Sequence, residues 1–286
     1  MSDPATNSIA RSQRSMLLLF GMASLPAIAA GAFAMQQDGH PLSLWIRNPA
    51  AWLVAGALSI LVIRSRRLPL VMPPLALAMI ALSFLGPGQE GVHRWIGLGP
   101  IQFNAAALVL PAAIAAFAAD RLGLISFAFV GALLAAQPDI SQLAGFALAS
   151  VILCAARFGW KGALGSTVIA AAAIAFCLSR PDPLEPVSHV EGIFLLAWGK
   201  SFALGSVMAA SLVCTALLPL LFRKNPKLKW SGGAALAAYF AATALAPAFG
   251  AYPVPLAGYG LSFVIGWWLG IAALAGLRAS PDATIP

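Results

Sequence analysis

The chain alternates between long apolar stretches and short polar breaks. The apolar stretches cover residues 15–35, 49–63, 68–85, 101–119, 122–136, 141–156, 163–178, 191–222, 232–249 and 256–277. Runs of about 20 apolar residues can span a hydrocarbon core roughly 30 Å thick. In lipid each segment must satisfy its own backbone hydrogen bonds, which helices do. The pattern therefore predicts an all-α, polytopic membrane protein with about ten transmembrane helices in one domain, 15–277, between short cytoplasmic tails at 1–14 and 278–286.

Two of these stretches have an unusual length or context. The first follows Arg11 and Arg14 and ends near the small residues 32–34, as a signal peptide would. Its apolar run is long for a signal peptide, so we expect a retained helix. The stretch 191–222 would be about 48 Å long as a single helix at 1.5 Å per residue. We expect its first two turns to stand above the membrane, with Lys200 near the outer boundary.

Composition supports lipid as the main solvent. Hydrophobic residues make up 60% of the chain and charged residues only 9%, whereas soluble domains carry about 25% charged residues. The net charge of +8 could suggest nucleic acid, but the basic residues are dispersed between apolar segments and form no basic face. No nucleic-acid partner is expected. The cysteines, which lie inside apolar runs without CxxC spacing, are interpreted as buried free thiols: Cys154, Cys177 and Cys214.

The distribution of charge predicts the orientation. With the N-terminus inside, 13 of the 17 basic residues fall on the inner side: Arg11, Arg14, Arg64, Arg66, Arg67, Arg121, Arg157, Lys161, Arg223, Lys224, Lys227, Lys229 and Arg278. Cytoplasmic loops are normally rich in Lys and Arg. The acids Asp38, Glu90, Asp139, Asp182, Glu185 and Glu191 fall outside or at the outer edge. Both termini are therefore predicted to be cytoplasmic.

Polar residues that could take part in binding or catalysis gather in four outer clusters. The cluster 91–103 contains Arg94, which could bind phosphate or anchor the loop at the interface, and Trp95, which suits that interface. Gln137-Pro138-Asp139 breaks two apolar stretches. Asp139 could cap the following helix or face a polar cavity.

The other two clusters flank the last third of the chain. His189-Val190-Glu191 precedes the long apolar stretch that contains Lys200. Lys200 could snorkel to the interface or pair with Asp139 or Glu191. The cluster 253–262 is rich in proline and glycine and predicts an irregular outer loop that borders protein or a wet cavity.

In order, these clusters resemble the motifs of the SEDS (FtsW/RodA/SpoVE) family. Residues 91–99 are similar to its G-x-R-R-W-I-x-L-G loop, 137–139 to its Q-P-D, 189–194 to its H-T-D-F-I-F, and 253–262 to its P-x-P-F-x-S-Y-G-G-S. The resemblance covers nearly the whole chain. It implies a peptidoglycan glycosyltransferase of the bacterial cytoplasmic membrane, acting in cell shape, elongation or division. The family polymerises lipid II, usually with a class B penicillin-binding protein.

The resemblance also implies a site. Glu191 stands where the family has its catalytic Asp and would act as general base on the acceptor sugar hydroxyl while undecaprenyl pyrophosphate leaves. Positive groups or a divalent cation would stabilise the leaving charge; no resident metal site is predicted. The expected substrate-binding residues are Arg94, Trp95, Asp139, Gln137, His189, Lys200, Tyr259 and Ser262.

Several family features are missing. Residues 104–107 read Asn-Ala-Ala-Ala where the family has Q-P-S-E, and Gly199 and Lys200 replace two acids. The outer loop 180–189 is short. The alternative is therefore a catalytically degenerate relative that binds a penicillin-binding protein or another lipid-linked glycan and regulates wall synthesis. A transporter ranks last, because the two halves show no internal repeat.

Overall fold

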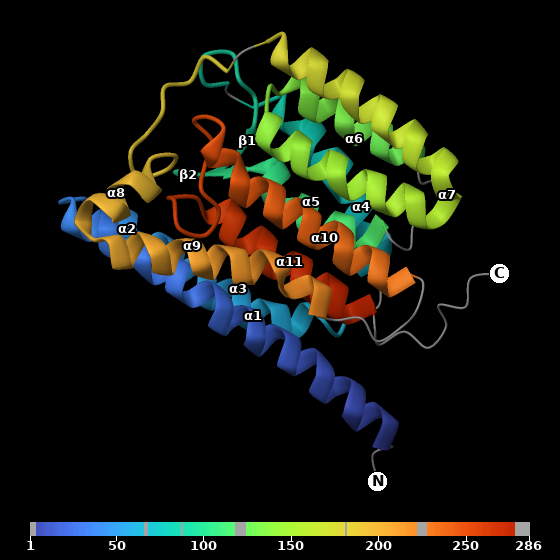
Figure 1. The fold of residues 1–286 in the computed structure, drawn as a ribbon, viewed down its shortest axis with the longest axis horizontal. Helices are drawn as coiled ribbons and strands as arrows, with labels where there is room; N and C mark the ends of the chain where they lie inside the picture. The colour runs from blue at the N-terminus through green and yellow to red at the C-terminus, as the bar shows by residue number, and fades with distance from the viewer. Residues whose placement is uncertain are drawn as a thin grey trace.

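A computed structural model describes residues 4–65, 68–86, 88–117, 124–180, 182–221 and 228–277. The elements along the chain are α1 (Pro4–Gln37), α2 (Leu42–Trp45), α3 (Arg47–Val62), α4 (Leu68–Ser83), β1 (Trp95–Leu98), β2 (Ile101–Asn104), α5 (Ala105–Phe117), α6 (Leu124–Ala136), α7 (Ile140–Leu178), α8 (Ile193–Lys200), α9 (Phe202–Leu217), η1 (Leu218–Leu221), α10 (Leu228–Leu245), η2 (Ala246–Ala248) and α11 (Leu261–Leu277). The long helices run side by side in one bundle (Figure 1). The predicted all-α class is confirmed.

The longest helix, α7, is a hairpin of two helices. Gly159 interrupts it with φ 65° and ψ −154°, a backbone conformation in which glycine pays no steric penalty. Leu143 and Phe146 from the first half line the same small pocket as Ile169 and Ala173 from the second half, so the two halves pack against each other. In the described ranges, α1, α3–α6, the two halves of α7, and α9–α11 then make ten long helical segments, in agreement with the predicted number.

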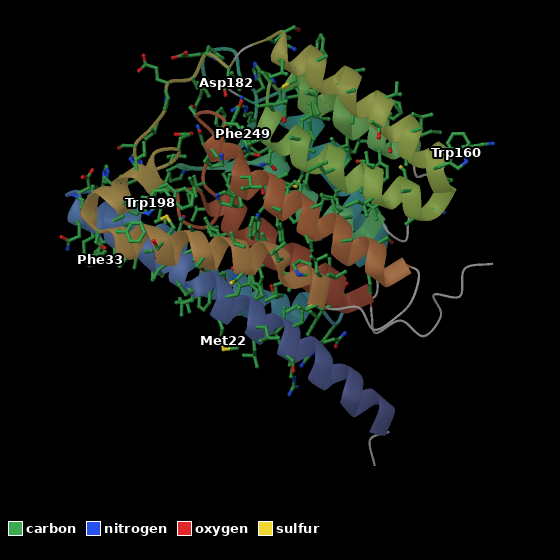
Figure 2. The ribbon with its side chains drawn as sticks, in the orientation of Figure 1. Met22, Phe33, Trp160, Asp182, Trp198 and Phe249 are labelled. Carbon is green, nitrogen blue, oxygen red and sulfur yellow. The ribbon has the colours of Figure 1, made fainter. Side chains whose placement is uncertain are left out.

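Length and composition support membrane crossing. Among the described residues, four helical stretches are long and apolar enough to cross a bilayer: Gln13–Gln37, Leu42–Val62, Ile140–Leu178 and Phe202–Leu221. Four shorter apolar helices join them: Val71–Ser83, Ala105–Phe117, Phe127–Ala136 and Leu261–Leu277. Large apolar side chains such as Met22 and Phe33 point outward from the bundle (Figure 2), as side chains solvated by lipid do. The protein is a polytopic membrane protein.

The centre of the bundle is formed by α5 and α11. Almost every described side chain of α5 is buried, and Trp267 of α11 stacks on Phe240 of α10 with ring centroids 3.9 Å apart. Gly266 of α11 lies against the Ala107 carbonyl of α5, where a Cβ atom would overlap that oxygen. Close approach of two helix backbones through a small residue is typical of membrane helix packing. These two helices hold the surrounding elements in place.

The predicted single helix over 191–222 is wrong. The chain is extended at Ser201, with φ −162° and ψ 146°, and this residue separates α8 from α9. The Ser201 hydroxyl accepts a hydrogen bond from the Leu204 amide and caps α9, which offsets the loss of helical bonds at the break. Lys200 therefore ends a short helix of its own instead of lying inside a transmembrane one.

Smaller differences occur at other boundaries. Residues 101–104, expected at the start of a helix, form β2, which pairs with β1 in a two-stranded antiparallel hairpin. Residues 256–260 belong to the irregular segment before α11. The helix α1 begins at Pro4, so it extends into the range 1–14 predicted as a tail, while the predicted tail 278–286 lies outside the described residues.

The two ends of the bundle differ. The helix α1 begins at the same end of the bundle at which α11 finishes (Figure 1). Trp160, at the bend of α7, is far from Asp182 and Trp198, which lie toward the opposite end (Figure 2). A chain that crosses a membrane an even number of times begins and ends on the same side, so α1 must begin at the end of the bundle at which α11 finishes. Many of the basic residues assigned to the inner side lie outside the described residues: Arg66, Arg67, Arg121, Arg223, Lys224, Lys227 and Arg278.

Candidate functional site

A cavity of about 560 Å³ opens at the end of the bundle that carries Asp182. Four segments supply its walls: the β1–β2 hairpin with the loop before it, the start of α7, the loop 182–191, and residues 251–263 leading into α11. Six of the predicted site residues line it together: Arg94, Trp95, Asp139, Glu191, Tyr259 and Ser262. Segments far apart in the sequence thus meet in one place.

Arg94 is the positive centre of this cavity. The residue is only 8% exposed. Its Nε donates to the carbonyl of Gln137 at 3.2 Å, and one terminal nitrogen donates to the carbonyl of Pro138 at 2.6 Å and to Asp182 at 2.5 Å. The carboxylate of Asp139 lies 3.9 Å from Nε. A buried charge needs such partners, so the guanidinium is fixed in orientation.

Asp139 both caps a helix and faces the cavity. One carboxylate oxygen accepts from the Ser141 hydroxyl at 3.0 Å and from the Gln142 amide at 3.3 Å, which caps α7. The other oxygen accepts from the Asn104 side chain at 3.1 Å. The two interpretations of Asp139 left open by the sequence are therefore compatible. With three hydrogen bonds accepted, Asp139 holds this part of the wall in place.

Glu191 lies in the turn that precedes α8. Its carboxylate accepts a hydrogen bond from the Val187 amide at 2.8 Å. Burial raises the pKa of the Glu191 carboxyl above its ordinary value; that hydrogen bond and the Arg94 charge oppose the rise, and Asp182 adds to it. A carboxylate with a raised pKa that lines a cavity suits proton abstraction.

Tyr259 and Ser262 complete the wall on the side of α11. The Tyr259 amide donates to the carbonyl of His189 at 2.8 Å, and the Tyr259 hydroxyl accepts from the Arg47 guanidinium. Ser262 is buried in the first turn of α11 and faces the cavity. Both residues therefore tie the cavity wall to helices of the bundle, Tyr259 through Arg47 of α3 and Ser262 as part of α11.

Three predicted residues do not line the cavity. Gln137 lies behind it, with its amide donating to Ser83 at 2.5 Å and to the Ile80 carbonyl at 3.2 Å. The His189 ring packs against Tyr259 with centroids 5.8 Å apart and against His40 at 4.6 Å, and burial lowers its pKa.

Lys200 is the clearest correction. It forms a salt bridge of 3.2 Å with Asp38 and donates to the Gln37 carbonyl at 3.2 Å. Of the two alternatives for Lys200, the pairing with Asp139 or Glu191 is therefore not what the structure shows, since Asp38 is the partner. The break at Ser201 explains the difference, because it directs α8 toward the end of α1 and away from the cavity.

The sequence interpretation missed other wall residues. Asp182 and Glu185 come from the short loop before His189, Tyr252 from the segment before α11, and Asn104 from the end of β2. Asn104 was counted only as a departure from the family pattern, and Asp182 as an outer acid. Five acids share the described wall with Arg94: Glu90, Asp139, Asp182, Glu185 and Glu191.

These carboxylates do not converge on one point. Among the described residues, no three or more His, Cys, Asp or Glu side chains form a group that could hold a metal ion. The acids are instead distributed around the cavity wall.

No family model and no curated protein matches the sequence. Solved structures do match. Rod shape determining protein RodA of Thermus thermophilus is 20% identical, with a TM-score of 0.62 over 91% of this chain and 95% of RodA. The chain has the RodA fold. A mutant of the same RodA aligns at 19% identity, with a TM-score of 0.61 over 91% of this chain and 96% of that chain.

A third structure agrees with this assignment. A chain in a peptidoglycan synthase complex that coordinates polymerization and crosslinking is 20% identical, with a TM-score of 0.65 over 92% of this chain and 98% of that one. The RodA fold thus covers more than nine-tenths of the chain and supports the resemblance to the SEDS family.

Proposed function

We propose that this protein is a divergent SEDS-type peptidoglycan glycosyltransferase that polymerises lipid II, or another undecaprenyl-linked glycan, at the outer face of the bacterial cytoplasmic membrane. The observation that carries the proposal is the placement of Glu191 and Arg94 in one cavity of about 560 Å³. The RodA fold supports it, since the cavity is built from the loops that carry the family motifs.

The proposed reaction divides the work between two groups. Glu191, ionised, takes the proton of the acceptor sugar hydroxyl as that oxygen attacks the anomeric carbon of the donor. The bond from that carbon to the pyrophosphate breaks, and undecaprenyl pyrophosphate leaves with the electron pair. Arg94 stabilises the charge that develops on the leaving group, because a fixed guanidinium needs no reorganisation during the reaction. A divalent cation carried by the pyrophosphate would add to this stabilisation.

The alternative is a non-catalytic relative that binds a class B penicillin-binding protein or a lipid-linked sugar. One observation favours it: Asp182 already occupies a terminal nitrogen of Arg94 at 2.5 Å, so an anionic leaving group must compete for the same donor. A chain in one matched structure belongs to a peptidoglycan synthase complex, and a partnership of that kind is compatible with both functions.

The deciding experiment gives the purified protein labelled lipid II, alone and with a class B penicillin-binding protein, and measures glycan polymer. We expect polymer from the wild type, and a loss of about 100-fold or more in Glu191→Gln, as is typical when a general base is removed. Glu185→Gln is the matched control, because Glu185 lines the same cavity from an exposed position. Equal polymer from both variants would rule out the proposed base, and a wild type that binds lipid II without polymerising it would establish the alternative.

A further inference from the structure

The turn that carries Glu191 is held from one side by the segment before α11. The Tyr259 amide donates to the carbonyl of His189 at 2.8 Å, and the Val254 amide donates to the carbonyl of Val190 at 3.3 Å. Gly258 lies so close that a Cβ atom there would overlap the Val190 carbonyl oxygen. The backbone position of Glu191 therefore depends on where residues 254–259 lie.

That segment has little regular structure of its own. Leu256 has φ 65°, a left-handed conformation that costs a residue with a side chain about 1 kcal/mol or more. Such a conformation persists only when surrounding contacts enforce it. Something outside the segment must therefore fix its path.

Asn48 supplies that constraint. It lies in the first turn of α3, is 2% exposed, and donates to the carbonyls of Leu256 at 3.0 Å and Gly258 at 2.7 Å. Its side-chain oxygen accepts from the Gly260 amide at 3.2 Å. One buried amide thus binds three backbone groups of the same segment, and both of its donors and its acceptor are used.

We propose that Asn48 is a positioning residue that sets the place of Glu191 through the backbone of residues 254–260. Asn48 fixes residues 256–260. The Tyr259 amide in this range and the neighbouring Val254 amide fix the carbonyls of His189 and Val190, and Glu191 follows directly in the chain. Asn48 does not line the cavity itself and has no described contact with the Glu191 side chain; it reaches the wall only through the backbone of Gly260. Its catalytic consequence rests on the proposed function, whereas its control of the turn does not.

Hydrogen–deuterium exchange of the full-length protein in detergent tests the structural step. In Asn48→Ala we expect the amides of residues 187–192 and 254–260 to exchange at least tenfold faster, with other described helices unchanged. Asn48→Asp is the second variant, used if Asn48→Ala does not fold. The aspartate side chain has nearly the same shape, but an oxygen replaces the amide nitrogen that donates to two carbonyls. We therefore expect the same exchange pattern. Ser59→Ala is the matched control, since Ser59 is buried in the same helix but faces the Trp268 carbonyl at 3.5 Å.

The outcomes separate the two claims. Faster exchange in 254–260 with 187–192 unchanged in a folded variant would overturn the proposal, because the coupling to the Glu191 turn would be missing. Faster exchange in both segments supports it, even if lipid II is never polymerised and the proposed function fails. If the wild type is active, the variant should lower kcat about tenfold with KM within about twofold. An effect confined to KM would contradict the positioning role.

Discussion

At the scale of single residues, the raised pKa of Glu191 has a direct kinetic consequence for the proposed reaction. Burial favours the neutral form, and a general base works only when ionised. The polymerisation rate should therefore fall as the pH drops through a pKa above the ordinary glutamate value of about 4.3. The measurement is kcat/KM for lipid II against pH, with tryptophan fluorescence recorded in parallel to confirm that the protein stays folded. An acid limb at the ordinary value would contradict the buried base.

Asp182 makes a second prediction at this scale. Its carboxylate holds a terminal nitrogen of Arg94 and competes with any pyrophosphate for that donor. Asp182→Asn should therefore tighten binding of undecaprenyl pyrophosphate by about tenfold, measured by titration of the purified protein, since charge-assisted hydrogen bonds to a guanidinium are the strong ones. Glu185→Gln removes the same charge from the same cavity without touching Arg94. An equal gain in both variants would mean that only net charge matters.

The sequence indicated which polar groups come together better than it indicated their contacts. Arg94, Asp139 and Glu191 line one cavity, as expected because an arginine or an acid at the edge of an apolar helix needs a polar environment. The partner of Lys200 was not predicted, because Asp139 and Glu191 were the acids considered and the structure pairs Lys200 with Asp38. A lysine in an apolar run has several acids within reach of its long side chain, and only the backbone break at Ser201 decides that Asp38 is the partner.

At the scale of secondary structure, the lengths of the apolar runs predict where the helices lie, but they do not predict where the helices are interrupted. Hydropathy located most helices within a few residues, because lipid leaves an isolated segment no alternative to a helix. The bend of α7 depends on one glycine with positive φ, Gly159, and the β1–β2 hairpin turns at Gly99 with φ 60°. Glycines of this kind cannot be distinguished in the sequence from glycines that pack inside helices.

The contact between α5 and α11 predicts a large effect from a small substitution. Gly266→Ala would place a Cβ atom against the Ala107 carbonyl, so the two central helices must separate. We expect destabilisation of about 1–3 kcal/mol, the usual cost of overpacking, seen as a lower midpoint of thermal unfolding in detergent.

Gly131→Ala in α6 is the matched control, because nothing lies within 4 Å of the added atom. Alanine there should be neutral or stabilising by up to about 1 kcal/mol through helix propensity. Equal loss at both positions would show that the α5–α11 contact is not the cause.

At the scale of the whole molecule, the hairpin of α7 and the position of the cavity together define a topology. Trp160 at the bend and Asp182 in the cavity wall lie toward opposite ends of the bundle (Figure 2). Basic residues flank Trp160, with Arg157 before it and Lys161 after it, so the positive-inside rule predicts that the bend lies in the cytoplasm. In that orientation the cavity faces outward, where the proposed lipid-linked glycan on the outer leaflet could enter it.

Single cysteines test this topology in intact cells. The background is a Cys214→Ser variant, because Cys214 is exposed while Cys154 and Cys177 are buried. We expect a membrane-impermeant maleimide to label Glu185→Cys from outside, and to label Trp160→Cys only after the membrane is opened. Labelling of both from one side would contradict the hairpin of α7, since a bend between two crossings must return the chain to the side from which it came. The reversed pattern would keep the hairpin but invert the protein, which would place Glu191 in the cytoplasm, away from any glycan on the outer leaflet.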